Sequence, residues 1–195
     1  YSTMEREKFK ESKRALEPYR VLDLTDQKGF FCGNLLGDLG ADVIKVERPG
    51  GDPSRNIGPF CGDKPHPEAS LLWWAYNANK RGITLDLQSP RGQGLFLELA
   101  KRSHFVIESF PPGYLDSLGL GYQALSQINP ALILTSITPF GQTGPYRDRQ
   151  TSDLVALAMG GLMYLCGDAD RPPVRPGPPL QAYLHAGAHA ACGTL

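Results

Sequence analysis

A strand, a helix and a second strand follow one another closely within residues 20–46, and this unit constrains the fold more than any other segment. Residues 20–24 (RVLDL) and 42–46 (DVIKV) are short apolar runs that are typical of buried strands, and residues 30–39 (FFCGNLLGDL) have helical character with small residues on one face. The length is close to the minimum for a crossover between parallel strands. Such crossovers are almost always right-handed, so the unit predicts the start of a parallel sheet.

The rest of the chain continues the same alternation. Apolar runs at residues 82–87, 105–108 and 132–137 predict three further strands. Helices are expected between and after them, at residues 70–79, 90–101, 112–118, 122–128, 152–165 and 182–195, and residues 49–67 form a long loop rich in proline and glycine. Strands that alternate with helices predict an α/β fold with a Rossmann-like, doubly wound parallel sheet.

The amino-acid composition argues against several classes of function. Lys and Arg together number 20, and so do Asp and Glu, so the net charge is zero and nucleic acid is disfavoured as a partner. No apolar run approaches a membrane span, and the N-terminus lacks the apolar region of a signal peptide. Residues 1–18 are instead expected to hold a charged, solvated helix. The final helix stops at Leu195 without a stop signal, which suggests a fragment of a longer protein.

Cysteine spacing bears on location and metal binding. Cys32, Cys61, Cys166 and Cys192 are widely spaced without a CxxC motif, three of them lie in apolar surroundings that predict burial, and a reducing cytoplasmic location fits best. His185 and His189 are four residues apart, but no third ligand is evident, so packing of these histidines near an interface is a better interpretation than a metal site.

Polar residues follow several predicted strands. The loop 25–29 (TDQKG) leads into a helix whose N-terminus, with Lys28, could hold an anion, and Arg48 offers a planar fork that suits phosphate. Taken singly, these residues favour a capped turn and a solvated arginine over an anion site. No GxGxxG motif supports dinucleotide binding. Asp153 is explained by helix capping, and Asp168 and Asp170 by turn formation.

The order and spacing of these motifs are more specific than any one of them. The series RVLDLT, LLGDLGADVIKVERPGGD, NANKRGITLDL, FVIESFPPGYLDSLGLGYQAL, INPALILTSITPFGQTGPY, SDLVALAMGGLMYLCG and RPPVRPG resembles the N-terminal half of class III CoA-transferases, the CaiB/BaiF family. The resemblance implies that residues 19–195 form a Rossmann-like CoA-binding domain whose companion small domain is absent from this chain. It also implies two homologous subunits, identical or different, threaded through each other as interlocked rings.

The resemblance further implies a site. Coenzyme A or an acyl-CoA thioester would lie over the strand ends as a substrate, and the matching motifs place its contacts at Gln27, Lys28, Arg48, Leu85, Gln88, Ser109 and Phe110. Two departures stand out. The first loop reads TDQKG where many members have an Ala-Gly-Pro run, and Ser109 replaces a frequent asparagine.

The family's nucleophile is missing from its expected place. In the family an aspartate four residues before a helix glycine attacks the thioester, giving an acyl–aspartyl anhydride and then an aspartyl-CoA thioester. Matching on Gly187 puts Tyr183 at that position, and no Asp or Glu follows Asp170. A phenol with a pKa near 10 cannot form these intermediates.

Three interpretations remain open. The chain could be the catalytically silent subunit of a heteromeric CoA-transferase that moves CoA between carboxylic acids. It could be an acyl-CoA racemase, isomerase or lyase of the same superfamily, or a non-enzymatic CoA-binding scaffold. The acyl group cannot be read from the sequence.

Overall fold

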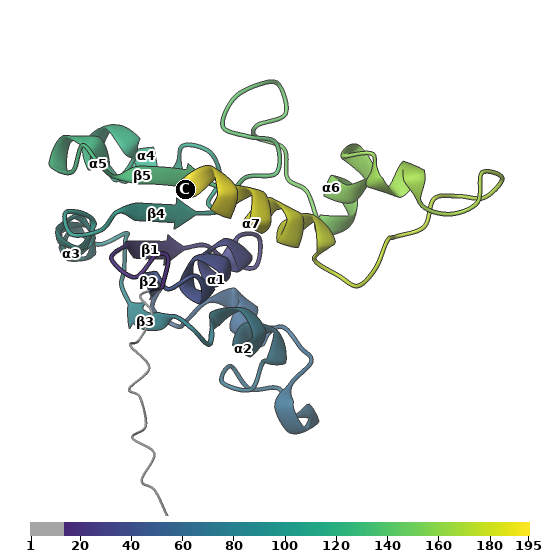
Figure 1. Cartoon of the computed structure of the whole chain (residues 1–195), viewed down its shortest axis with the longest axis horizontal. Helices are drawn as coiled ribbons and strands as arrows, with labels where there is room; N and C mark the ends of the chain where they lie inside the picture. Colours follow the sequence, from purple (N-terminus) through teal and green to yellow (C-terminus); the bar gives the residue numbers. More distant parts are fainter. Residues whose placement is uncertain (1–13) are drawn as a thin grey trace, which may run out of the picture.

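The fold is an α/β sandwich around one parallel sheet. The computed structural model describes residues 14–195. Five strands are hydrogen-bonded in the order β3-β2-β1-β4-β5, and every neighbouring pair is parallel (Figure 1). Their bounds are Arg20–Leu24 for β1, Asp42–Glu47 for β2, Arg81–Thr84 for β3, Phe105–Glu108 for β4 and Ile133–Ser136 for β5. The predicted doubly wound parallel sheet is confirmed, and its order reverses between β1 and β4.

Seven α-helices connect or follow the strands within the described residues. They are α1 (Phe30–Asp38), α2 (Leu71–Asn77), α3 (Pro90–Ala100), α4 (Tyr114–Ser117), α5 (Tyr122–Ile128), α6 (Asp153–Met159) and α7 (Gln181–Thr194). The long loop after β2 contains two 3₁₀ turns, η1 (Pro53–Asn56) and η2 (Cys61–Asp63), and a third, η3 (Leu162–Leu165), follows α6. Figure 1 shows α6 and the loop after it extending beyond the sheet.

Two cores lie on opposite faces of the sheet, because successive strand residues point in opposite directions. Leu22, Ile44 and Val106 face one way and pack with residues of α3, α4 and α5. Their neighbours Val21, Val43, Phe105 and Ile107 face the other way and pack with α1 and α7. The central strands are therefore covered on both sides, as their continuous apolar sequences predict.

A charged network is buried on the α1 face, where the strand pattern would otherwise place apolar residues. Asp23 of β1 lies opposite Lys45 of β2 in the sheet register, with 4.0 Å between the carboxylate and the ammonium group. Lys80, just before β3, donates to Asp23 at 2.8 Å, and Lys45 lies 3.2 Å from the carboxylate of Asp52. All four side chains are at most 7% exposed. Two cations and two anions thus balance within the core.

The lysines of this network also form hydrogen bonds to the backbone. The Lys80 ammonium group donates to the carbonyl of Phe30 at 2.8 Å and to the side chain of Asn77 at 2.9 Å, which ties the start of α1 to the end of α2. Lys45 donates to the carbonyl of Thr25, the first residue after β1. Burial alone would raise the pKa of Asp23, but the two lysines outweigh it and hold that pKa below its usual value. The ion network therefore fixes the loop that follows β1.

Several sequence predictions were wrong in detail. The helix expected at residues 152–165 ends at Met159, because Gly161 adopts a left-handed conformation with φ of +80° that no continuous helix contains. The third strand ends at Thr84, so Leu85 and the next residues leave the sheet. The helices expected at residues 70–79 and 112–118 are shorter, at Leu71–Asn77 and Tyr114–Ser117.

Other predictions concern cysteines and the N-terminus. Only Cys32 is buried, whereas Cys61 and Cys192 are exposed and Cys166 is intermediate. Cys61 and Cys166 lie in loop segments away from the two cores, and Cys192 is exposed although its neighbour Ala191 on α7 belongs to a core. Most of the predicted charged N-terminal helix lies outside the described residues, and residues 15–18 form a turn. Among residues 14–195, no helix has the length and apolarity that crossing a bilayer would need.

We predict that Lys80→Met will strongly destabilise the protein. The substitution keeps most of the side-chain volume but leaves Asp23 buried with only the more distant Lys45 as a counter-charge, so the free energy of unfolding should fall by about 3 kcal/mol. Urea denaturation measures this. The matched control is Lys101→Met, which breaks the exposed Lys101–Glu98 pair and should change stability by less than about 0.5 kcal/mol. Equal effects for the two variants would contradict the role given to the network.

Candidate functional site

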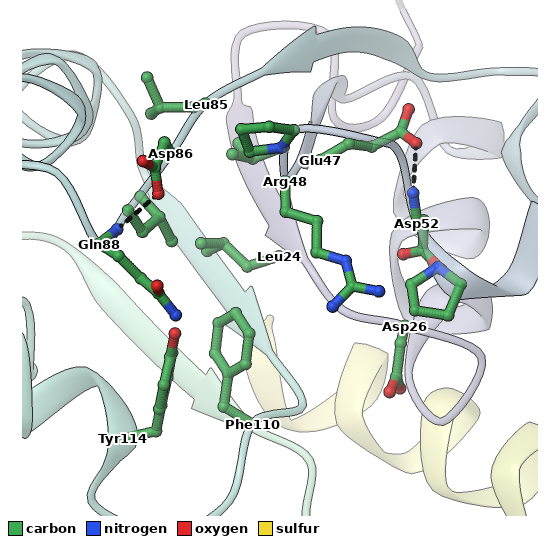
Figure 2. A pocket seen from close by; sticks show the side chains of 14 residues that line it. Leu24, Asp26, Glu47, Arg48, Asp52, Leu85, Asp86, Gln88, Phe110 and Tyr114 are labelled. Carbon is green, nitrogen blue, oxygen red and sulfur yellow. Dashed lines mark hydrogen bonds between the residues drawn. The ribbon is translucent and has the colours of Figure 1, made fainter.

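A large cavity in the described part of the chain lies at the carboxyl ends of the strands. Its volume is about 630 Å³, and its walls come from residues that follow β1, β2, β3 and β4 (Figure 2). The β1 end contributes Leu24 and Asp26, and the β2 end contributes Val46 to Pro49 with Asp52 and Pro53. The segment after β3 contributes Leu85 to Gln88, and the segment after β4 contributes Phe110 and Tyr114. Because the sheet order reverses between β1 and β4, the loops diverge there and leave a crevice, the usual ligand position in such sheets.

Arg48 is the only cation among the described residues that line this cavity. Figure 2 shows its side chain reaching into the cavity from the end of β2, and its Nε lies 3.4 Å from the carbonyl of Gly51. The neighbouring Glu47 does not neutralise it, because both Glu47 oxygens are occupied by Arg55 at 2.7 and 2.8 Å. Burial would raise the pKa of Glu47, but Arg55 and the backbone N–H of Asp52 keep it lowered. Arg48 is thus left available for an external anion.

The other acidic residues of the cavity are also engaged. Asp52 pairs with Lys45, Asp26 pairs with Lys28, and Asp86 accepts the backbone N–H of Gln88 at 3.0 Å. Three of the four carboxylates on the cavity wall therefore have a cationic partner, and Asp86 has only a backbone N–H.

One wall of the cavity is aromatic and apolar. The rings of Phe110 and Tyr114 lie 4.7 Å apart between centroids and meet at a tilt of 39°. The carboxylate of Glu108 accepts the backbone N–H of Phe110 at 2.6 Å and thereby fixes the turn that presents this ring. Leu24 and Leu85 complete the apolar surface. A guanidinium on one side and an aromatic wall on the other suit a ligand that is both anionic and partly flat.

The structure brings four of the seven predicted contacts to this cavity: Arg48, Leu85, Gln88 and Phe110. Ser109 is buried, donates to Asp26 Oδ1 at 2.9 Å and accepts the backbone N–H of Asp26 at 2.9 Å, so its hydroxyl holds the first loop. Lys28 pairs with Asp26 and faces a different cavity. Gln27 lines neither of the two cavities.

That second cavity, of about 210 Å³, lies beside the first. It is lined by the polar residues Lys28, Thr138, Thr151 and Tyr183, together with the apolar residues Ile137, Pro139, Ala156, Ala182 and Ala186. The Asp26–Lys28 pair joins the two cavities, since Asp26 lines the first and Lys28 the second. Burial raises the pKa of Tyr183, and the negative charges of Asp153 and Asp26 add to this.

Asp153 positions the helix that carries Tyr183. The hydroxyl of Ser152 caps α6 by accepting the N–H of Val155, while the carboxylate of Asp153 accepts the N–H of Ala182 at 2.8 Å and a bond from Arg175 at 3.1 Å. The predicted capping role of Asp153 therefore applies to the start of α7 rather than to its own helix. The α7 N-cap residue, Leu180, has φ of +75° and supplies no side-chain cap.

Sequence reasoning missed several lining residues. Tyr114 and Asp26 stand next to predicted contacts, in segments that were already expected at the strand ends, so position alone could have nominated them. Thr138 follows β5 in the same way. His185 and His189 lie on the exposed side of α7, and no group of three or more potential ligands that could hold a metal ion occurs within residues 14–195.

Comparison with known proteins matches residues 16–195 to CoA-transferase family III. The chain is 45% identical over 90% of its length to the succinyl-CoA:(R)-benzylsuccinate CoA-transferase subunit BbsE of Thauera aromatica, covering 43% of that protein. It is 45% identical over 85% of its length to the succinyl-CoA–L-malate CoA-transferase beta subunit of Chloroflexus aurantiacus, covering 40% of that protein. The chain thus spans less than half the length of these curated relatives.

A solved structure has the same fold. The crystal structure of a CAIB/BAIF family protein from Brucella suis superposes with a TM-score of 0.85 at 38% identity, over 94% of this chain and 48% of that one.

We predict that Glu108→Gln will alter the pH dependence of stability. Burial raises the pKa of Glu108 above its ordinary 4.5, and its hydrogen bonds offset this only partly. The folded state then binds a proton more tightly than the unfolded state, so stability is lost as the pH rises from 4.5 through the folded pKa. Glutamine stays neutral, so the stability of the variant relative to the wild type should rise over that window in urea titrations at several pH values.

The exposed Glu98→Gln variant is the control for this experiment. The pKa of Glu98 is lowered by its hydrogen bond to Lys101, so any trend for this variant should have the opposite sign. A stability difference for Glu108→Gln that does not change with pH would contradict the assignment.

Proposed function

The chain belongs to CoA-transferase family III, and from this membership we propose that its strand-end cavity binds coenzyme A or an acyl-CoA thioester. The cavity is the single observation that carries the proposal, because it unites Arg48, Leu85, Gln88 and Phe110 from three separate loops. Its volume of about 630 Å³ falls in the usual range of ligand sites. The whole protein would move CoA between carboxylic acids.

Each lining group has a proposed role. Arg48 binds phosphate through charge-assisted hydrogen bonds, since its own neighbours do not satisfy it. The Phe110–Tyr114 wall contacts flat or apolar parts of the ligand, and Leu85 and Gln88 border the same space. Gln27, Lys28 and Ser109 belong to the same proposed region, but Lys28 and Ser109 act through Asp26, whose position they fix.

The residue at the expected nucleophile position supports a role as a non-acylated subunit. Tyr183 lies in the first turn of α7, and its raised pKa keeps the phenol protonated and non-nucleophilic at neutral pH. We propose that a homologous partner subunit supplies the carboxylate that takes up the acyl group. Two of the relatives are themselves named as subunits of CoA-transferases.

A second function is favoured by one specific observation. Asp26 lines the large cavity, and its negative charge contributes, after burial and Asp153, to the raised pKa of Tyr183. A carboxylate and a phenol on two sides of an acyl-CoA could act as base and acid in a racemase or isomerase. Exchange of the α-hydrogen of an acyl-CoA in D₂O, catalysed by the chain alone, would favour this function, and exchange that requires a partner would not.

We predict that Arg48→Ala will weaken CoA binding ten- to a hundredfold. The reason is the loss of hydrogen bonds between a guanidinium and a phosphate, each worth about 1.5–3 kcal/mol. Isothermal titration calorimetry with CoA measures the change. Arg91→Ala, at an exposed position on α3, is the matched control and should bind as the wild type does. Wild-type affinity in Arg48→Ala would contradict the phosphate role.

Tyr183→Asp should gain covalent labelling. With a carboxylate restored at that position, incubation with succinyl-CoA should produce an aspartyl-CoA thioester that intact-mass spectrometry detects, whereas wild type and Tyr183→Asn remain unlabelled. Absence of label in a folded, CoA-binding Tyr183→Asp protein would show that position 183 does not correspond to the nucleophile.

A further inference from the structure

Arg48 lies in a short loop whose two ends are joined by one ion pair. The loop, residues 47–55, runs from Glu47 at the end of β2 to Arg55 in η1, and we call it the Arg48 loop. The Nε and Nη2 atoms of Arg55 donate to the two carboxylate oxygens of Glu47 at 2.7 and 2.8 Å. The two side chains are only 17% and 8% exposed, so water competes little for these bonds. The pair therefore closes the Arg48 loop at its base.

Hydrogen bonds inside the Arg48 loop fix its shape. The Glu47 carboxylate also accepts the backbone N–H of Asp52 at 2.9 Å (Figure 2), and the N–H of Gly51 donates to the carbonyl of Arg48 at 2.9 Å. Gly50 and Gly51 have φ of +89° and +85°, so the chain reverses direction there in the left-handed region. The backbone that carries Arg48 is thus held from both sides.

Arg55 is itself attached to α2 and to the segment before that helix. Its guanidinium lies over the ring of Trp73, 4.1 Å from the ring centroid, and its Nη1 donates to Glu68 at 3.0 Å. Trp73 is a buried residue of α2. One guanidinium group therefore connects the Arg48 loop to a helix on the scaffold.

The position of Arg55 indicates an indirect role. Among the described residues that line the large cavity are Glu47, Arg48 and Asp52 but not Arg55, so Arg55 acts on the cavity only through the loop. A side chain that is already held in its binding orientation loses less conformational entropy when a ligand arrives. The effect of Arg55 should therefore appear as ligand affinity and should depend on Arg48.

We propose that Arg55 is a positioning residue for the large cavity: its paired bonds to Glu47 hold the Arg48 loop in the conformation that directs Arg48 into the ligand space. The inference rests on the proposed function, because it takes the phosphate of CoA as the group that Arg48 meets. Lysine cannot replace Arg55 in this role, since a single ammonium group lacks the planar fork that engages both oxygens of Glu47.

A double-mutant cycle on CoA affinity, measured by isothermal titration calorimetry, tests the proposal. Arg55→Lys should weaken CoA binding about tenfold in the wild-type background but less than about twofold when Arg48→Ala is already present, because no guanidinium is left to position. Arg55→Gln, which also lacks the paired bonds, should show the same dependence on Arg48. Arg20→Lys is the matched control: it alters the Arg20–Asp42 pair at the opposite ends of the strands and should leave CoA affinity unchanged.

The cycle separates positioning from a general effect on folding. An equal loss of CoA affinity in both backgrounds would show that Arg55 only stabilises the fold, and it would overturn the proposal, as would wild-type affinity in Arg55→Lys and Arg55→Gln. Thermal unfolding of each variant confirms that the protein titrated is folded. Failure of the wild type to bind CoA would overturn the proposed function and this inference together, whereas binding that depends on Arg48 but not on Arg55 would overturn this inference alone.

Discussion

The buried ion network around Asp23 is the interaction on which the site depends. Burying the Asp23 carboxylate in a central strand without a counter-charge would cost a large amount of free energy. Its burial therefore requires both Lys45 and Lys80. The ammonium groups of both lysines also donate hydrogen bonds to backbone carbonyl groups. Lys45 holds the carbonyl of Thr25 and pairs with Asp52, so the loops after β1 and β2 are fixed by the same charge.

Ion pairing of the acidic side chains then determines the charge of the large cavity. Three of the four carboxylates on its wall are paired with cations, as Glu47 is with Arg55, and Arg48 is the one cation among the described residues that line this cavity. A chain with no net charge can therefore present a guanidinium group to a cavity whose acidic residues are mostly paired.

Much of the fold and part of the site could be predicted from sequence. Apolar runs separated by helical segments fixed the parallel sheet, and since the carboxyl ends of parallel strands meet at one edge, Arg48 and Phe110 could be placed in one cavity in advance. Ser109 and Lys28 were harder to place, because both side chains bond to Asp26 and neither lines the large cavity, and a sequence does not reveal which nearby polar group a side chain will bond to. The break at Gly161 was missed because a glycine pair is compatible with both close packing and a helix end.

We propose one account for this chain, in which its strand-end cavity binds CoA and another subunit, rather than Tyr183, performs the covalent step. Hydrogen–deuterium exchange with and without CoA tests the central part of this account most directly. It should show added protection in the loops after β2, β3 and β4, around Arg48, Gln88 and Phe110. Protection confined to α6 and α7, or no protection at all, would contradict it.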